Sequence, residues 1–229
     1  EQQDVYSYDP YLAESYDVSE DGLTYTFNLR EDVVSVAGNT LDADDVIWSF
    51  ERKFASPRSV VPGVMAPSIP DPAEQITKID DQTVAFTLPN AGLGVTFLAL
   101  MSDLCGQIFD SELLQEHVTP DDPYAVDWTV DNPNYGFGPY EVTDYQPGTS
   151  VTLNARDDYF DEPPQISTVN VRIVADPGTR ANAVSNGDAG LATGIAPADS
   201  AAMQDDPSVK VPQVEDPNTF IMMPLLTNK

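Results

Sequence analysis

Two apolar segments that alternate at period two around an Asp-Gly turn constrain the fold of this chain more than any other feature. Tyr16 and Val18 alternate with polar residues before the turn, and the alternation resumes from Leu23 to Leu29. Residues two apart share one face of a strand, and Gly22 tolerates the positive φ that tight turns need. The pattern therefore predicts an antiparallel β-hairpin with one apolar face.

A helix is expected to begin at Asp42. The Asp42 side chain can accept hydrogen bonds from the first turn, where Asp44 and Asp45 also favour the positive end of the helix dipole. Apolar residues then recur at helical spacing, which predicts one buried face and one exposed face. The buried face would hold Val46, Ile47, Phe50 and Phe54, while Glu51, Arg52 and Lys53 would point to solvent.

The remaining pattern consists of short elements separated by turns. Before residue 134 we expect a loop over 56–72, a hairpin turning at 80–82, a helix over 93–100, a strand over 105–109, a helix capped by Ser111 that ends near His117, and a surface excursion over 118–134. A change of pattern near residues 130–135 marks a candidate subdomain junction. Beyond it, strands and helices alternate, which predicts an α/β layer with a mixed sheet. Its strands would cover 139–145, 149–155, 168–174, 209–211 and 219–223, and its helices 176–187 and 197–204.

The balance of charges excludes one class of function. The 229 residues include 10 Lys and Arg against 38 Asp and Glu, for a formal net charge of −28. A protein that follows nucleic-acid phosphates needs clustered Lys and Arg, so we predict no nucleic-acid partner. The same argument weakens any role on an anionic membrane surface. Apolar residues make up 41% of the chain, so a folded domain with an acidic coat is expected, whether in a high-salt habitat or as an ordinary secreted protein.

Nucleophilic catalysis and metal chemistry find little support in the residue types. His117 is the only histidine and Cys105 the only cysteine. A Ser-His-Asp or Cys-His arrangement would have to use that one imidazole, and a thiolate zinc site would have too few ligands. We expect His117 to be exposed at a helix end and Cys105 to be a buried, inert thiol. No catalytic residue, metal site or cofactor is predicted, and no apolar run approaches the ~20 residues that cross a bilayer.

Two short motifs allow both a functional and a structural interpretation. The segment 17–22 copies the first half of an EF-hand loop, but position twelve would be Asn28 in place of a bidentate Glu, so a hairpin turn is favoured. The Gly-Phe-Gly segment before Pro139 follows no predicted strand, and Pro139 lacks the N–H that a phosphate cradle would use. That segment is interpreted either as a tight entry into a strand or as a connection that lines a cleft.

Several motifs together are similar to one family. Residues 12–30 read LAESYDVSEDGLTYTFNLR, and residues 37–52 read AGNTLDADDVIWSFER. They resemble the patterns LAE-W-V-S-DG-TYTF-LR and DG-PLTA-DV-FS-ER of the peptide/nickel class of extracytoplasmic solute-binding proteins, family 5, with Asp42 in place of the capping Thr. In the same order, residues 136–140, 154–160 and 185–192 resemble that family's GTGPY, RNPDYW and SGEIDVA.

The resemblance implies a periplasmic-binding-protein-like fold of class II. This is an α/β architecture with β-hairpins and α+β character in its accessory part. Residues 1–133 would form the accessory subdomain of hairpins and short helices, and residues 134–229 part of the first main α/β lobe. Family members continue into a second lobe that these motifs do not reach, so the chain is expected to be a fragment.

By the same resemblance, the chain is expected to be the solute-binding component of an ABC importer and not an enzyme. It would capture peptides, or a related solute such as a nickel complex or an oligosaccharide, between two lobes and deliver them to the membrane permease subunits. It would act as a monomer outside the cytoplasm, periplasmic or at the cell surface, with membrane contact only through a lipid anchor outside this chain. A ligand sensor of the same fold and a secreted acidic hydrolase or calcium-dependent module stay open as alternatives.

This chain would contribute one wall of the cleft. An aromatic side chain beside a Gly-rich turn can contact a ligand without needing charge, while the family's charged anchors for peptide termini lie in its second lobe. With half of the site absent, weak binding or none is expected. The candidate ligand-binding residues are Met101, Ser102 and Asp103 in an apolar turn, and Asn134, Tyr135 and Phe137 before the Gly-Pro-Tyr strand.

Overall fold

The computed structural model describes residues 8–211, which belong to two compact units. The first unit runs to Val171 and the second begins at Arg172. The predicted division into 1–133 and 134–229 concerns lobes of the family fold and stays a prediction. Within residues 8–211, no helix has the length and apolar character needed to cross a membrane.

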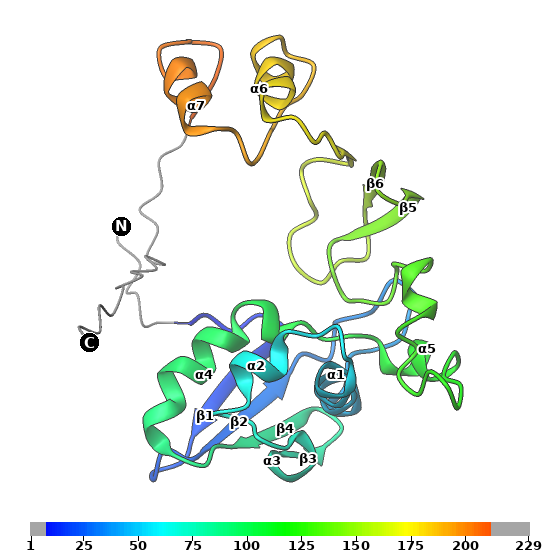
Figure 1. Cartoon of the computed structure of the whole chain (residues 1–229). Helices are drawn as coiled ribbons and strands as arrows, with labels where there is room; N and C mark the ends of the chain where they lie inside the picture. The colour runs from blue at the N-terminus through cyan, green and yellow to red at the C-terminus, as the bar shows by residue number, and fades with distance from the viewer. Residues whose placement is uncertain (1–7, 212–229) are drawn as a thin grey trace, which may run out of the picture. The chain divides into compact units, whose positions relative to one another are not determined.

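A four-stranded antiparallel sheet dominates the first unit (Figure 1). Its strands are β1 (Ala13–Val18), β2 (Thr24–Leu29), β3 (Ile76–Asp80) and β4 (Thr83–Thr87), in the order β1-β2-β4-β3. Both predicted hairpins are confirmed. The first turns at Gly22, whose φ of 72° lies in the left-handed region that glycine adopts without strain.

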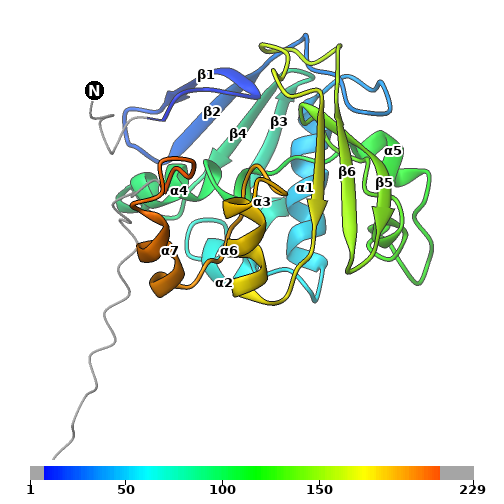
Figure 2. The same cartoon turned by 90° about the horizontal axis from the view of Figure 1, so that it is seen from above.

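Helix α1 (Ala43–Ala55) packs against β3 and β4, beside which it runs in Figure 2. The Asp42 carboxylate accepts hydrogen bonds from the N–H groups of Asp44 and Asp45, and the Asp45 carboxylate accepts one from the Asp42 N–H. This reciprocal capping box confirms the predicted start of the helix.

The core of the first unit is built around Phe86 of β4. Its ring centroid lies 5.3 Å from that of Phe50 in α1 and 5.4 Å from that of Phe97 in α4 (Gly94–Met101). All three side chains are fully buried. Sheet, α1 and α4 therefore share one apolar core.

The predicted outer face of α1 is wrong for two residues. Arg52 and Lys53 are buried, with 9% and 5% of their surface exposed. Segments distant in the sequence cover this face and supply backbone carbonyls and aromatic rings to both cations. A helical pattern shows which residues share a face but not what later covers it, so the error arises from tertiary structure.

The strand predicted over 105–109 is also wrong. A short 3-10 helix, η2 (Leu104–Gly106), occupies its first part. Only Phe109 pairs, in an isolated bridge with Gly136. The turn is tighter than a strand allows, because Gly106 lies against the preceding segment. Cys105 is fully buried, as predicted.

The helix predicted to start with Ser111 is α5 (Ser111–Gln115), but its cap is Asp110. The Asp110 carboxylate accepts a hydrogen bond from the Leu113 N–H at 2.9 Å. The carboxylate reaches that N–H from one residue earlier than the predicted hydroxyl. The other short helices of this part are α2 (Val61–Met65) inside the loop predicted over 56–72, α3 (Pro72–Gln75) at its end, η1 (Ala91–Leu93) and η3 (Trp128–Val130).

A smaller sheet follows, with strands β5 (Tyr140–Gln146), β6 (Ser150–Ala155) and β7 (Thr168–Arg172) in the order β5-β6-β7. Strands β5 and β6 are antiparallel, and the predicted turn between them is confirmed. Gly148 in this turn has a φ of 71°.

Arg156 joins the smaller sheet to the N-terminal part of the first unit. Its guanidinium donates hydrogen bonds to the carbonyls of Val34, Ser35 and Gly138, at 3.0, 2.9 and 3.1 Å. It also forms an ion pair with Asp158. Because Arg156 is only 5% exposed, these charge-assisted bonds fix the entry into β5 beside the loop at residues 34–35.

The described part of the second unit contains α6 (Pro177–Ser185) and α7 (Pro197–Met203). Asp176 caps α6 by accepting a hydrogen bond from the Thr179 N–H at 2.7 Å, as predicted. The strand predicted over 209–211 is wrong, since these residues are irregular. The strand predicted over 219–223 lies outside the described residues.

Candidate ligand-binding pocket

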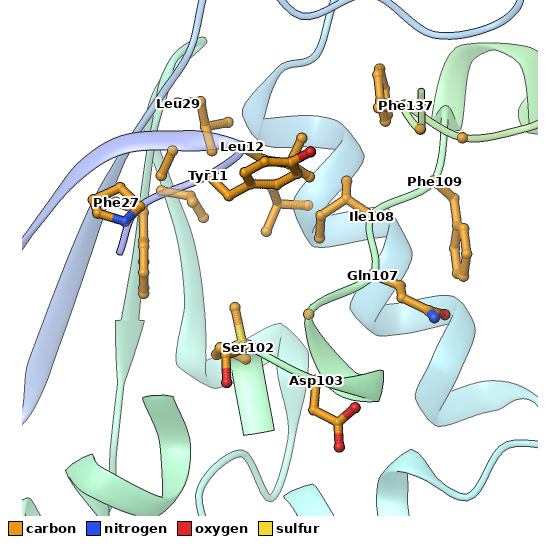
Figure 3. Close-up of a pocket in the computed structure, with 18 of the residues that line it drawn as sticks. Tyr11, Leu12, Phe27, Leu29, Ser102, Asp103, Gln107, Ile108, Phe109 and Phe137 are labelled. Atoms are coloured by element: carbon orange, nitrogen blue, oxygen red, sulfur yellow. The ribbon is translucent and has the colours of Figure 1, made fainter. Parts of the chain in front are cut away.

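A pocket of about 700 Å³ opens in the first unit between the N-terminal segment, α4 and the connection that leads into β5 (Figure 3). Most of its wall is apolar. Figure 3 shows Tyr11 and Leu12 on one side of the opening and Ser102 and Asp103 on the opposite side. The lining comes from residues 8–13, Tyr16, Phe27, Leu29, Val46, Val84, Phe86, Leu98, residues 101–103, residues 106–109, Pro133, residues 135–139 and Tyr159.

The polar side of the pocket is a tight turn after α4. The Gly106 N–H donates a hydrogen bond to the Asp103 carbonyl at 3.0 Å. A Cβ at Gly106 would lie 1.7 Å from the Met101 carbonyl oxygen, so no other residue fits there without moving the backbone. The Ser102 hydroxyl is also engaged, donating to the Ala99 carbonyl at 2.8 Å.

Lys53 holds the same turn from behind. Its Nζ donates to the Cys105 carbonyl at 2.8 Å and also to the Gln107 carbonyl. The ammonium lies 4.7 Å from the ring centroid of Phe50 and 5.3 Å from that of Phe109, both favourable cation–π contacts. Burial lowers the pKa of Lys53 to about 7, because desolvation disfavours the charged amine.

Arg52 supports the neighbouring aromatic wall. Its guanidinium carbon lies 5.0 Å from the ring centroid of Phe109 and 5.7 Å from that of Tyr135, and these two rings meet edge to face. The guanidinium also donates to the Tyr124 carbonyl and the Thr129 hydroxyl, each at 3.0 Å. Burial lowers the pKa of Arg52. Two adjacent cations of α1 thus fix this side of the pocket.

Tyr11 forms the opposite edge. Its hydroxyl is hydrogen-bonded to the hydroxyl of Tyr159, and its ring meets Phe160 edge to face at 5.4 Å. Burial, with the Tyr11 contact second, raises the pKa of Tyr159. Arg30 lies 5.0 Å over the Phe160 ring and extends this cluster.

Five of the six predicted ligand-binding residues line this pocket: Met101, Ser102, Asp103, Tyr135 and Phe137. Their role in binding stays a prediction. Asn134 lies elsewhere, because its side-chain amide exchanges two hydrogen bonds with the backbone of Val142, at 2.8 and 2.7 Å. That amide orders the start of β5 and lines a separate depression.

Sequence reasoning did not identify Tyr11, Lys53 or Gln107 as parts of the site. Tyr11 stands one residue before the first family motif, and Lys53 carried only the signal of a helix surface. Gln107 follows a glycine that is itself informative, because a turn glycine often marks a close backbone approach. None of these signals indicates which distant segment the side chain will meet.

The other candidate groups have structural roles. In the EF-hand-like segment, the Asp21 carboxylate accepts hydrogen bonds from the Ser19 hydroxyl and the Leu23 N–H, as a hairpin turn requires. His117 follows α5 and stacks on Trp128 with ring centroids 3.9 Å apart. Burial raises the pKa of Asp45 to about 6 against the hydrogen bond from the Ser111 N–H. Among residues 8–211, no group of three or more acidic, His or Cys side chains could hold a metal ion.

Comparison with known proteins relates this fold to one family. The family model for bacterial extracellular solute-binding proteins, family 5 Middle, matches residues 7–228. The dipeptide-binding protein of Escherichia coli K12 is 31% identical over 217 residues, which are 88% of this chain and 39% of that protein. Heme-binding protein A of Haemophilus influenzae is 28% identical over 216 residues, which are 89% of this chain and 38% of that protein.

Among solved structures, MoaA of A. tumefaciens R10 in complex with mannopinic acid is 30% identical with a TM-score of 0.64. The match covers 78% of this chain and 33% of that one. The chain thus spans about 40% or less of the length of these relatives. Its architecture is the expected periplasmic-binding-protein-like fold in part. Since the family match extends over nearly all of its residues, the chain belongs to the bacterial extracellular solute-binding proteins of family 5.

Proposed function

We propose that the pocket is one wall of a solute-binding cleft, and that the protein captures peptides outside the cytoplasm and delivers them to the permease of an ABC importer. The observation that carries this proposal is the 700 Å³ apolar pocket, at which five residues predicted for ligand binding gather. Ligand pockets of proteins usually measure about 300–1,000 Å³ and combine apolar walls with a few polar groups.

The construction of the wall supports binding in preference to catalysis. Lys53 and Arg52 direct their donors to backbone carbonyls, a hydroxyl and ring faces and so hold the wall in place. A rigid wall lowers the entropic cost of binding, because fewer side chains must be ordered when the ligand arrives. Peptides are the proposed solute because the dipeptide-binding protein of E. coli is among the relatives at 31% identity.

A thermal-shift screen tests the proposal, since a ligand stabilises the folded state by RT ln(1 + [L]/Kd). A tripeptide pool, haem and a nickel–histidine complex would each be added at millimolar concentration, because one wall alone is expected to bind weakly. We expect the peptide pool to raise the melting temperature. A shift with haem or nickel–histidine and none with peptides would overturn the peptide assignment.

Tyr11→Ala tests whether the pocket is the binding surface. Tyr11 is 54% exposed at the pocket edge, so its removal should reduce the peptide-induced shift by opening that edge. Tyr145→Ala is a matched control, because Tyr145 is 38% exposed and does not line this pocket. Equal ligand-induced shifts in both variants would show that binding occurs elsewhere.

A further inference from the structure

We infer that the pocket selects solutes that carry a positively charged group beside an apolar one, and that Asp103 receives the charge. This inference rests on the proposed function of the same pocket and goes further by naming the chemistry of the solute. It assigns Asp103 a role in specificity, whereas the rest of the wall serves to exclude water.

The charge of the pocket lining has one sign. Among the described residues that line it, none is Lys, Arg or His, and the carboxylates are Asp9 and Asp103. Lys53 and Arg52 lie behind the wall with their donors directed to protein oxygens. An anionic solute would therefore meet carboxylates without a facing cation, while a cationic solute would meet a complementary charge.

Asp103 differs from other acidic residues around the pocket in having a free carboxylate. The carboxylates of Asp45 and Asp110 accept backbone N–H groups at 2.7 and 2.9 Å, and that of Asp158 pairs with Arg156. For Asp103, no described residue forms an ion pair with the carboxylate, and the residue is exposed. Figure 3 shows it at the rim, beside Ser102 and across the opening from Tyr11.

The turn that carries Asp103 is held more firmly than an exposed loop needs to be. Gly106 bonds to the Asp103 carbonyl and permits the close approach to Met101, while Lys53 binds the carbonyls of the two residues flanking Gly106. Burying an ammonium without a carboxylate partner is costly. A cost accepted to fix one exposed turn indicates that the position of the turn matters, as a preorganised binding group requires.

The solute that fits carries an amine on an apolar body. Its apolar part would cover the side of the pocket formed by Leu12, Phe27 and Leu29, which Figure 3 shows away from Asp103. Its ammonium would then meet the Asp103 carboxylate at the polar rim, with Gln107 nearby. A peptide with an apolar residue next to its free amino terminus has this chemistry, and so does a simple aromatic amine.

Two probes that differ only in charge test the inference. Phenylalaninamide carries an ammonium, and N-acetyl-phenylalaninamide lacks it. Titration of the 229-residue chain, followed by backbone amide chemical shifts, measures millimolar affinities and locates the probe. We expect phenylalaninamide to bind roughly threefold more tightly, as befits an exposed ion pair, with the largest shifts at residues 101–109. Asp103→Asn should abolish this preference and leave the affinity for the acetylated probe unchanged.

Asp121→Asn is the matched control, because Asp121 is an exposed carboxylate outside the pocket and the variant changes the net charge equally. If Asp121→Asn reduces the preference as much as Asp103→Asn, the effect is one of overall charge and the inference is wrong. If both probes shift pocket residues with equal affinity, the pocket binds solutes without selecting a charge, which removes the inference alone. If neither probe shifts them, the proposed function of the pocket falls as well.

Discussion

The two units of the chain are held together by different interactions. In the first unit, a continuous apolar core connects the four-stranded sheet to α1 and α4. Among the described residues, every buried apolar side chain except that of Ala181 lies at or before Phe137. In the second unit, Ile173 and Leu191 are 59% and 82% exposed.

Polar contacts to the backbone take the place of a core in the second unit. The Arg180 guanidinium donates to the carbonyls of Val174, Ala175, Thr193 and Gly194, and the Asp176 carboxylate caps α6. Such contacts fix local geometry but bury little apolar surface, which is the main source of stability. The comparison teaches that the first unit can fold on its own core, whereas the helices of the second depend on local signals.

Removing the central core ring should have the largest effect on stability. Phe86→Ala deletes a fully buried ring that contacts Phe50 and Phe97, so it should lower the free energy of unfolding by about 3–5 kcal/mol. Ile173→Ala removes a side chain that is 59% exposed in the second unit and should change it by less than about 0.5 kcal/mol. Urea unfolding followed by tyrosine and tryptophan fluorescence measures both. Similar losses in the two variants would show that the units share one core.

A pH series tests the buried cation of the first unit. The pKa of Lys53 is about 7 in the folded chain and its ordinary value is 10.5. Between these values the unfolded chain binds one proton more, so stability should rise with pH by up to roughly 1.4 kcal/mol per unit. Below pH 7 both states are protonated and this contribution is constant. Lys53→Met should lack the rise, although it also leaves two carbonyls without their donor.

Chemical unfolding of both proteins at pH 6, 7, 8 and 9 isolates this contribution, because the other titrating groups are common to both. The stability of the unmodified chain relative to Lys53→Met should increase from pH 7 to pH 9. Lys210→Met, which removes an exposed lysine from the second unit, serves as a control for net charge. An equal pH dependence in both variants would exclude Lys53 as the cause.

The same contrast separates what the sequence could predict from what it could not. The turns at Gly22 and Gly148 and the caps at Asp42 and Asp176 were predictable, because each depends on residues within one turn of the backbone. These local signals occur in both units. They establish the elements but do not indicate how stably the elements are held.

The pocket was predictable only in part. The resemblance to a family led to Met101 and Tyr135, because motifs preserve the order of elements. Lys53 was assigned to solvent because its carbonyl partner at Cys105 is 52 residues away in the sequence. Asn134 was assigned to the ligand, yet its amide is satisfied by Val142. In each case the outcome depends on a tertiary partner that neither periodicity nor motif spacing specifies.

The helix caps should show the smallest effect and the clearest distinction between the units. Asp42→Ala removes the cap of α1, which packs on the core, so it should lower amide protection by about 1 kcal/mol across α1 and β4 together. Asp176→Ala removes the equivalent bond from α6 and should reduce protection only within α6. Native-state hydrogen exchange measures both variants residue by residue. If Asp176→Ala also lowers protection in β4, the two units open as one cooperative structure, and the core of the first unit extends its stability to the second.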